Sequence, residues 1–524
     1  MEFKIIFTTA RQVVIEILDE GIYEIEEYEI YLNDEVIKNS QKAVESNDNL
    51  HPDTPYSIFI KTKFDISEKK YLTTNKEFVT LNVKEFGAKG DGIQDATVFI
   101  QSAICACPRE GRVLIPKGIY KVTSLFLKSN LVLELAKDAV LSAITDKNKF
   151  PVLPGLIESY DETEEYNLGT WEGNPLDMFS AVITGIGVSN ITICGQGVLD
   201  GNADFMNWWK DPKVKNKAYR PRMIFLNHCD KVTVQGITIR NSPSWNIHPY
   251  FSRNLKFIDL AILNPKDSPN TDGINPESCT NVEITGVYFS VGDDCIAIKS
   301  GKTYMGSKYK TASENIIIRQ CFMKDGHGSV TIGSEMSGGV RQVTVRDCMF
   351  FSTDRGFRLK TRRGRGWDGV IDEILLDHII MDQVKTPIVI NSFYYCDPDG
   401  HSEYVSTKKA QPVDERTPSI HNIAFQNITC TNCHVAAAFI YGLPEKKINK
   451  IFMNHIQIDF TENPVSGIPD MMDGIENLTN GGIFAENIVE LEMKQVIIKG
   501  FKGKGMKLNN INHLNLDKIT NDLL

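Results

Sequence analysis

The segment KVTVQGITIRNS (residues 231–242) decides the fold, because altered copies of it follow along the chain. Among them are NLKFIDLAILNP (254–265), NVEITGVYFSVG (281–292) and NIIIRQCFMKDG (315–326). Each copy is a pair of short β-type runs joined by Gly, Asn or Asp. Successive copies begin 23, 27, 34, 27, 31 and 49 residues apart, at Lys231, Asn254, Asn281, Asn315, Gln342, Glu373 and Asn422. A loose period with insertions is typical of a solenoid whose coils stack on one another.

Several strands per coil, with no helical pattern between them, favour an all-β architecture, a right-handed parallel β-helix. Residues 98–107 (VFIQSAICAC) precede the repeats and space apolar side chains as a short amphipathic helix does. We expect this helix to cover the N-terminal end of the core, because solenoid ends need caps. The long polar insertions are expected to wall a groove and to close one end of it; they are residues 154–177, 202–221, 300–313 and 396–418.

Residues 1–78 differ from the rest of the chain. They contain short alternating segments, such as VVIEIL (13–18) and YSIFIKTKF (56–64), separated by polar or Pro-containing turns. This spacing predicts a small β-sandwich that resembles a fibronectin type III module. We interpret it as a spacer, with carbohydrate binding as the alternative, and assign residues 79–524 to the β-helix.

The composition excludes several classes of protein. With 42% hydrophobic and 24% charged residues and no apolar run of about 18 residues, the 524-residue chain is not predicted to enter a membrane. The formal net charge of −10 argues against a nucleic-acid partner. The N-terminal sequence lacks the layout of a secretory signal, so we expect a cytoplasmic location. The eleven cysteines are interpreted as small buried hydrophobes rather than disulfides or metal ligands.

Lysines and arginines are concentrated between residues 299 and 365, against the acidic average of the chain. Such a segment is either a solvated face or the wall of a cleft that holds an anionic ligand.

Three short segments place polar residues where the repeat otherwise has apolar or turn residues: NTDG (270–273), GDDC (292–295) and GHG (326–328). Asp293 follows Asp272 by 21 residues, close to one coil, and stacked coils lie about 4.8 Å apart, so their carboxylates are expected side by side. Asp294 points to the same side only if the backbone bends, which Gly292 would permit. His327 and then Arg358 each follow after about one further coil, and Lys360 shares a strand face with Arg358.

This column of three carboxylates, one imidazole and two cations has a chemical interpretation. Hydrolysis of a glycosidic bond needs one carboxylic acid that donates a proton and one carboxylate that activates water or attacks directly. Clustered like charges raise the pKa of one member, which keeps it protonated. Arginine and lysine pair with the carboxylate of a uronic acid. Taken singly, each motif is more often a turn or a surface charge, and only their joint occurrence at coil spacing indicates function.

On these motifs the sequence resembles glycoside hydrolase family 28, the polygalacturonases. The matching segments are NTDG, GDDC, GHGSVTIGSEMSGGV (326–340) and RLKT (358–361), within a likeness that covers roughly residues 80–524. The resemblance implies an inverting hydrolase of α-1,4-linked galacturonic acid chains, with an anionic pectic substrate and with no metal or organic cofactor. It implies that Asp293 is the general acid, that Asp272 and Asp294 hold and deprotonate water, and that His327 tunes the acid.

The resemblance also implies substrate-binding residues. Arg358 and Lys360 would bind the galacturonate carboxylate, and Tyr394 matches the tyrosine that contacts substrate in the family, with Tyr395 as its rival. A resemblance to the bacterial exo-acting branch is seen in the segment SEMSGGV (334–340), in SPSWNIHP (242–249) and in the long loops. Trp245 and His248 would then line the pocket, or else pack within the fold. Asn275 stands where the family often has Asp.

Alternatives remain open at this point. A pectate lyase would share the fold but use calcium and a basic residue. A β-helical adhesin or tailspike-like protein would hold polysaccharide without cutting it. Rhamnogalacturonan and xylogalacturonan are the alternative substrates of a hydrolase.

Overall fold

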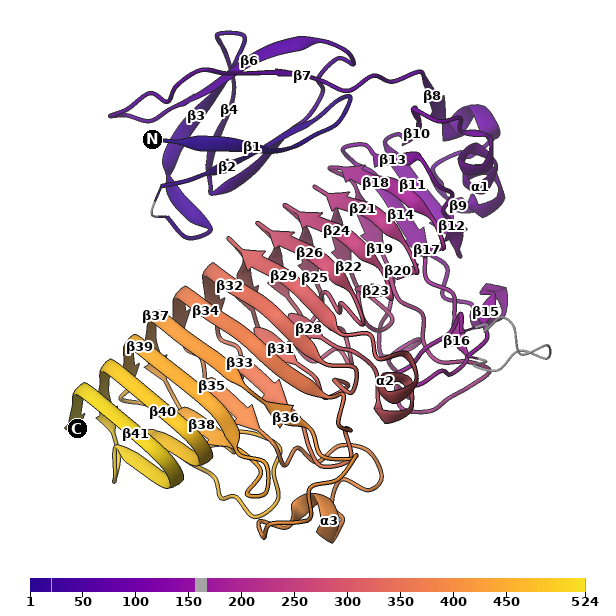
Figure 1. The fold of residues 1–524 in the computed structure, drawn as a ribbon. Coiled ribbons are helices and arrows are strands. Elements are labelled where there is room, and N and C mark those ends of the chain that lie inside the picture. The colour runs from indigo at the N-terminus through magenta and orange to yellow at the C-terminus, as the bar shows by residue number, and fades with distance from the viewer. Residues whose placement is uncertain (20, 156–166, 524) are drawn as a thin grey trace.

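The computed structural model describes residues 1–19, 21–155 and 167–523. Most of these residues form an elongated parallel β-helix, and two small antiparallel sheets lie beside its N-terminal coils (Figure 1). The predicted all-β fold class is therefore confirmed. The part of the chain that the structure describes contains no helix long and apolar enough to span a bilayer.

The strands of the β-helix stack in three columns. The first column contains β8 Val79–Asn82, β10 Gly111–Ile115, β13 Leu131–Leu135, β18 Ser189–Gly195, β21 Asp230–Gln235, β24 Arg253–Ile258, β26 Thr280–Thr285 and β29 Ser313–Arg319. The second contains β9 Asp91–Asp95, β11 Gly118–Val122, β14 Ala139–Ala143, β19 Val198–Asp200, β22 Thr238–Arg240, β25 Ala261–Leu263, β27 Tyr288–Ser290 and β30 Phe322–Lys324. Later coils join these two columns in long strands: β32 Val340–Phe351, β34 Val370–Asp382, β37 Asn422–Cys433, β39 Ile448–Phe460, β40 Gly481–Phe501 and β41 Met506–Leu523.

The third column carries the long loops. It contains β12 Leu125–Phe126, β17 Ile183–Ile186, β20 Ile224–Asn227, β23 Ile247–Tyr250, β28 Ile296–Ile298, β31 Val330–Ile332, β33 Arg355–Lys360, β35 Thr386–Asn391 and β38 Ala436–Tyr441, and it ends in the first parts of β40 and β41. Isolated parallel bridges of Ile274 to Ile247 and to Ile296 continue the column where no full strand forms. The remaining short elements are β15 Val152–Leu153, β16 Met178–Phe179, β36 Ser419–Ile420, α2 Thr303–Tyr309, α3 Glu403–Ser406 and two 3₁₀ turns, Val83–Phe86 and Lys147–Lys149.

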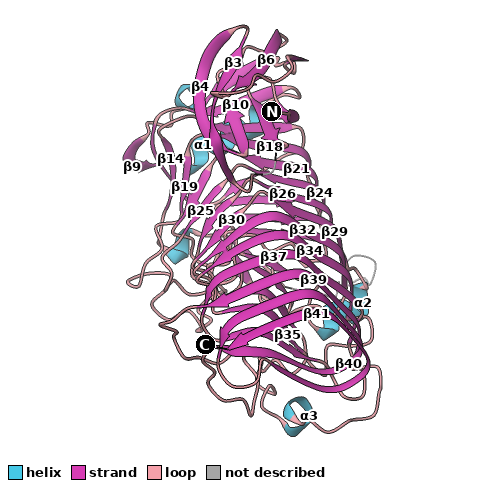
Figure 2. Cartoon of the chain, turned by 90° about the vertical axis from the view of Figure 1, so that its left-hand side faces the viewer, coloured by secondary structure: helices cyan, strands magenta, loops and turns pink. Residues whose placement is uncertain are grey.

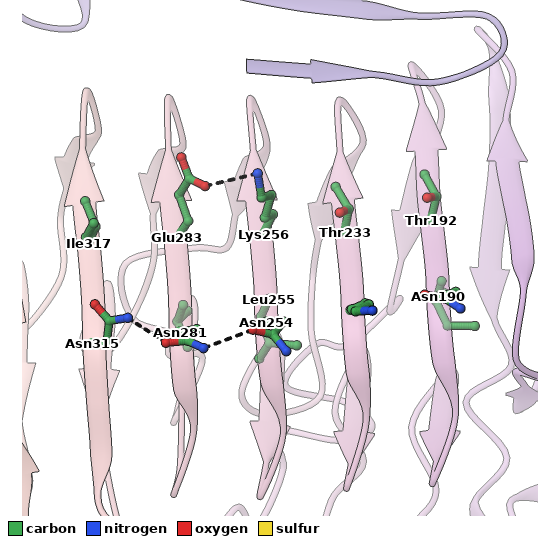
Figure 3. A pocket seen from close by; sticks show the side chains of 13 residues that line it. Asn190, Thr192, Thr233, Asn254, Leu255, Lys256, Asn281, Glu283, Asn315 and Ile317 are labelled. Carbon is green, nitrogen blue, oxygen red and sulfur yellow. Dashed lines mark hydrogen bonds and ion pairs between the residues drawn. The ribbon is translucent and has the colours of Figure 1, made fainter. Parts of the chain in front are cut away.

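The unequal repeat spacing read from the sequence is the spacing of the coils. Asp230 pairs in parallel with Arg253, and Arg253 with Thr280, on coils of 23 and 27 residues. The residues that open six of the repeats, from Lys231 to Glu373, have left-handed φ values of 53° to 59°. Asparagine tolerates this conformation better than most residues. Its amides also form a ladder along the outer face, with Asn281 Nδ2 donating to Asn254 Oδ1 at 3.0 Å (Figure 3).

The interior of the β-helix is one continuous apolar core, built from columns of Ile, Val, Leu and Phe. Helix α1 (Thr97–Ala106) lies at its N-terminal end (Figure 2) and buries Ile100, Ala103 and Ile104 in the same core. The expected cap is thus present. All eleven cysteines are free, and nine of them are buried, as predicted for small hydrophobes.

The first 73 residues form the two small sheets. One contains β1 Phe3–Thr8, β2 Val13–Ile17 and β5 Val44–Asn47; the other contains β3 Glu24–Leu32, β4 Glu35–Lys42, β6 Pro55–Lys61 and β7 Lys70–Thr73. Their facing side chains make a separate apolar core.

Buried polar contacts hold these small sheets on the first column. Arg319 Nε donates to Glu16 Oε1 at 2.8 Å, and Asp259 accepts from Lys42 at 2.8 Å and from Ser46 at 2.6 Å. Because the Arg319–Glu16 pair is largely shielded from water, it fixes the position of the N-terminal sheets more firmly than a surface pair would.

Candidate active site

A cleft of about 740 Å³ runs along the third column, where the long loops meet. A second hollow, of about 600 Å³, lies on the outer face of the first column (Figure 3). The second hollow is lined by Asn, Thr and aliphatic side chains, and its one acid, Glu283, pairs with Lys256 at 3.4 Å. Only the first cleft contains several carboxylates together with unsatisfied acceptor atoms, so we take it as the candidate active site.

The parallel register brings the predicted acids together. Ile274 pairs with Ile296, so Asp272 and Asp294, each two residues earlier, occupy the same position on neighbouring coils. Ile296 pairs with Val330, so Asp293 and His327, each three residues earlier, are likewise equivalent. All four side chains line the cleft. The structure therefore brings these residues together on one surface, with Asp294 rather than Asp293 as the counterpart of Asp272.

Asp293 and Asp294 both reach the cleft because the chain is not a strand there. Residues 291–295 form a bend between β27 and β28, as expected. Gly292 was expected to permit this bend, but the structure gives a different reason for a glycine here. Its φ is not left-handed, but a Cβ at this position would lie 2.2 Å from the Ser268 carbonyl oxygen. Close approach of two backbones, rather than a special φ, requires glycine.

Asp294 is held as an anion. Its Oδ2 accepts from Lys360 Nζ at 2.8 Å, and its Oδ1 lies 3.5 Å from an Arg358 guanidinium nitrogen. Burial alone raises the pKa of a carboxyl, but the two cations outweigh that effect and hold the pKa of Asp294 far below its usual range. The sequence placed Arg358 and Lys360 in the site for substrate; the structure shows that they also neutralise Asp294.

Asp272 has the opposite electrostatics. It is almost completely buried, and Asp293 and Asp294 are its charged neighbours, so burial and like-charge repulsion raise its pKa to about 8. Asn275 Nδ2 donates to Asp272 Oδ2 at 2.9 Å, while Asp272 Oδ1 has no partner. An aspartate at position 275 would add a fourth negative charge in contact with Asp272, so Asn275 suits this cluster.

Asp293 is the most open of the three predicted acids, with 23% of its side chain exposed. His327 Nδ1 lies 3.2 Å from Asp293 Oδ1, and this contact raises the pKa of the imidazole. Asp354, at the equivalent position one coil further on, adds to that effect. His327 is thus poised to carry a proton beside Asp293.

The cations of the site are positioned by an acid that sequence reasoning missed. Asp470 is fully buried and accepts from Arg358 Nε at 3.0 Å and from Arg358 Nη2 at 2.7 Å. Its second oxygen accepts from Asn391 Nδ2 at 2.9 Å. Asp470 lies 112 residues after Arg358 in an irregular loop, so no periodicity pointed to it.

Of the two candidate tyrosines, Tyr394 lines the cleft. Its ring centroid lies 5.4 Å from both the Arg358 guanidinium and the Lys360 ammonium. Tyr395 instead packs on His401, with ring centroids 4.6 Å apart. Substrate contact by Tyr394 stays a prediction that this placement supports.

A second group that sequence reasoning missed lines the same cleft. Lys299 Nζ donates to Glu335 Oε2 at 2.9 Å, and Lys302 pairs with Asp397 at 2.6 Å. Burial raises the pKa of Glu335, but Lys299 and Lys302 lower it more strongly, to about 2. The basic segment gave a signal for Lys299 and Lys302, whereas nothing in the sequence distinguished their acidic partners.

The basic segment as a whole is largely neutralised within the fold. Besides Lys299, Lys302, Arg358 and Lys360, several of its members pair with acids: Lys310 with Asp368, Arg341 with Glu314, Arg346 with Asp347, Arg362 with Asp399, Arg363 with Glu445 and Arg365 with Asp397. Five of its members line the cleft, as the cleft interpretation predicts: Lys299, Lys302, Arg355, Arg358 and Lys360. The segment therefore supplies cations to the cleft and ion pairs to the surrounding loops and strands.

His248 does not line the cleft, so the prediction that it contacts substrate is wrong. Its ring is fully buried, and Nε2 lies 2.9 Å from Glu277 Oε2. Burial and the nearby cations Arg222 and Lys299 lower the pKa of His248 well below its usual value. The neighbouring Trp245 does reach the cleft.

All four long insertions contribute to the walls of the cleft. Trp171 comes from 154–177, Tyr219 from 202–221, Lys302 from 300–313 and Asp397 from 396–418. Residues 156–166 of the first insertion lie outside the described residues. In the described part of the chain, no group of three or more His, Cys, Asp or Glu side chains is arranged to hold a metal ion.

Comparison with known proteins agrees with this geometry. The family model described as glycosyl hydrolases family 28 matches residues 157–481, and one described as rhamnogalacturonase A/epimerase, pectate lyase-like, matches residues 80–134. A probable polygalacturonase of Vitis vinifera is 31% identical over 405 residues, which are 76% of this chain and 77% of the plant protein.

Two solved structures share the architecture. The family 28 exopolygalacturonase of Yersinia enterocolitica superposes with a TM-score of 0.72 at 18% identity, over 98% of this chain and 99% of that one. The hyperthermoactive exopolygalacturonase of Thermotoga maritima gives a TM-score of 0.59 at 26% identity, over 83% and 91% of the two chains. The likeness to the Yersinia protein is one of fold, and it includes the N-terminal sheets.

Proposed function

This chain belongs to glycosyl hydrolases family 28 and is a glycoside hydrolase, and from that premise we propose that it cleaves α-1,4 bonds of polygalacturonate with inversion. One observation carries the proposal: three carboxylates and two fixed cations converge in a single cleft. The carboxylates suit hydrolysis of a glycosidic bond. The cations suit a substrate that carries one carboxylate on each sugar.

The exposure and charge of the three carboxylates support a separate catalytic role for each. Asp293 faces the open cleft and contacts His327, so we assign it the role of general acid toward the departing oxygen. Asp294 stays ionised beside Lys360 and holds the attacking water. Asp272 takes the proton that this water loses, in the state in which the proton shared by the cluster lies on Asp293 and Asp272 is ionised. Inversion then needs about 6.5 to 9.5 Å between acid and base, so that water fits.

The protonation state of the carboxylates in the free enzyme supports this scheme. With the pKa of Asp272 near 8 and Asp294 ionised, the cluster retains one proton at neutral pH. That proton belongs to the interacting carboxylates together. In our scheme Asp293 delivers it to the leaving oxygen, and the proton released by water replaces it, so that the cluster returns to its starting state.

We further propose exo action, with release of galacturonate from chain ends. The support is the wall of Trp171, Pro212, Lys213 and Tyr219, which lines the cleft on the side of the coils that precede Asp272. Two relatives by structure are named exopolygalacturonases. We also infer a fibronectin type III-like module in residues 1–78, supported by its sheets of three and four antiparallel strands.

The central test is Asp293→Asn. We expect a loss of at least about a thousandfold in kcat, because a positioned acid is removed, with substrate affinity largely kept. Asp267→Asn, at an exposed aspartate nearby, is the matched control and should keep full activity. Unchanged turnover in the Asp293 variant would refute the assignment.

Two product assays separate the alternatives. A lyase would release unsaturated product in a reaction that a chelator abolishes, whereas we expect reducing ends without unsaturation and no effect of EDTA. On long polygalacturonate, monomer from the outset supports exo action and a ladder of oligomers contradicts it. Activity on rhamnogalacturonan or xylogalacturonan above that on polygalacturonate would contradict the proposed substrate.

A further inference from the structure

A cluster of aromatic rings and cations connects the loop wall of the cleft to the coils beneath it. The Arg222 guanidinium carbon lies 4.6 Å from the ring centroid of Trp171 and 4.6 Å from that of Trp245. The two rings are inclined by only 12°, with centroids 6.5 Å apart. Near-parallel rings at this separation leave room for one planar group, and a guanidinium is planar.

The cluster extends on from both tryptophans. The Tyr219 ring stacks on Trp171 at 4.8 Å, inclined by 10°, and Lys299 Nζ lies 4.8 Å from the Trp245 ring centroid. We call these five residues, Tyr219, Trp171, Arg222, Trp245 and Lys299, the aromatic–cation cluster. Four of them line the cleft, and Arg222 is the fully buried centre.

Hydrogen bonds make Arg222 a link between two parts of the chain. Its Nη2 donates to the Thr170 carbonyl at 3.2 Å, directly before Trp171 in the loop. Its Nη1 donates to the Arg220 carbonyl at 2.9 Å, at the end of the 202–221 insertion, and to Ser244 Oγ at 3.2 Å, on the next coil. The loop is therefore attached to the β-helix through one guanidinium, in addition to the ring contacts.

The register ties this link to the acids of the cleft. Ile224 pairs with Ile247, and Ile247 bridges to Ile274, which bridges to Ile296. The residues two positions earlier are Arg222, Trp245, Asp272 and Asp294, so all four occupy one ladder on successive coils. A wall positioned by Arg222 is consequently placed at a fixed number of coils from Asp272 and Asp294.

Burial of Arg222 is costly. In the described ranges no carboxylate lies within ion-pairing distance of its guanidinium, and Nε has no hydrogen-bond partner. Burial lowers the pKa of Arg222 to about 9. A methionine or leucine would fill such a space with a smaller desolvation penalty. The presence of an arginine here is therefore explained by its contacts with the surrounding rings and carbonyl groups.

We propose that Arg222 is a positioning residue that holds the Trp171–Tyr219 wall against Trp245 and thereby sets how far a sugar chain can extend beyond the carboxylates. This inference rests on the proposed exo action. It assigns the limit on product length to a buried cation that itself does not contact the substrate.

The test compares Arg222→Met, Arg222→Lys and the control Arg253→Met, at an arginine whose side chain is 68% exposed. Desolvated cation–π contacts and hydrogen bonds of this kind lead us to expect a rise of about tenfold or more in KM for short oligogalacturonides in Arg222→Met, with a smaller change in kcat. Dimer and trimer should appear beside monomer at the earliest times. Arg222→Lys should recover part of the wild-type pattern, and Arg253→Met should match wild type.

Hydrogen exchange of residues 167–177 gives an independent measurement of the wall. We expect faster exchange there in Arg222→Met, with unchanged exchange in the core strands, which separates loss of positioning from loss of folding. If Arg222→Met keeps wild-type exchange in this loop, or keeps wild-type KM and monomer-only product, the inference is wrong. If wild-type enzyme itself gives a ladder of oligomers, the exo proposal fails first, and the limit on product length that we assign to Arg222 fails with it.

Discussion

The buried contact between Asp470 and Arg358 offers a sharp test of how the cleft is built. Asp470 accepts two hydrogen bonds from the guanidinium, at 3.0 and 2.7 Å, and lies 3.8 Å from Arg355 Nε. In Asp470→Asn the shape is kept but the negative charge is lost. Arg358 and Arg355 then remain buried with one fewer counter-charge.

The expected magnitude follows from this geometry. Removing one partner of a buried ion pair costs about 3–5 kcal/mol, and we take about 3 kcal/mol, since the amide oxygen still accepts a hydrogen bond. At about 2.1 cal/mol/K per residue, a 524-residue chain unfolds with an entropy of roughly 1.1 kcal/mol/K, so Tm should fall by about 3 °C. A misplaced Arg358 also loses a charge-assisted contact worth about 2–3 kcal/mol, or roughly 30- to 150-fold in KM for oligogalacturonides.

The pH dependence has a definite sign. The cations hold the pKa of Asp470 below its usual value, so its contribution to stability is complete above the unfolded pKa and is lost as the pH falls through the folded pKa. The difference in Tm between wild type and Asp470→Asn should therefore shrink in acid. Thermal unfolding across pH and steady-state kinetics measure both effects.

The matched control is Asp473→Asn, three residues further along the same loop. Asp473 pairs with His401, and its side chain is 35% exposed, so its loss should change Tm and KM little. If Asp470→Asn behaves like Asp473→Asn in both assays, the idea that Asp470 positions Arg358 is refuted.

Further predictions concern the other charges. Lys360→Met removes the nearest cation from Asp294, so the pKa of Asp294 should rise by about 1–3. The acid limb of the kcat/KM profile should then move to higher pH by up to that amount. An unmoved limb would mean that Asp294 need not ionise. Asp293→Asn should lower the pKa of His327, because the contact that raises it is lost, and NMR titration of the imidazole would detect an opposite or absent shift. Arg319→Met should lower Tm by about 3 °C, since Glu16 is then left with only the partly exposed Lys4 and about 3 kcal/mol is lost; a change under about 1 °C would show that this pair does not stabilise the docked N-terminal sheets.

Much of the fold was predictable because repetition is a property of the sequence itself. The spacing from Lys231 to Glu373 gave the coil lengths, since each of those residues occupies the same left-handed corner. The cap at 98–107 and the buried cysteines followed from local periodicity and apolar character. The same arithmetic brought Asp272, Asp293, Asp294 and His327 to one cleft.

Predictions from the local sequence pattern were wrong where segments distant in the sequence determine the environment of a residue. His248 was predicted to contact substrate because SPSWNIHP resembles the exo-acting branch, yet Glu277 on the next coil pairs with it beneath the surface. The role of Gly292 was misjudged because the contact that requires glycine comes from Ser268, on another turn of the chain.

The amino-acid sequence by itself determined the β-helix, its period and the identity of the acids, because these depend on residues one coil apart. Only the tertiary structure decided which acid is ionised, which acids hold the cations of the cleft and how the wall is attached. Asp470, Glu335 and Arg222 act through contacts with residues that irregular loops bring to them, and the sequence separation across such loops follows no period. Charge interactions depend on distance and burial in three dimensions, which a spacing along the chain does not specify.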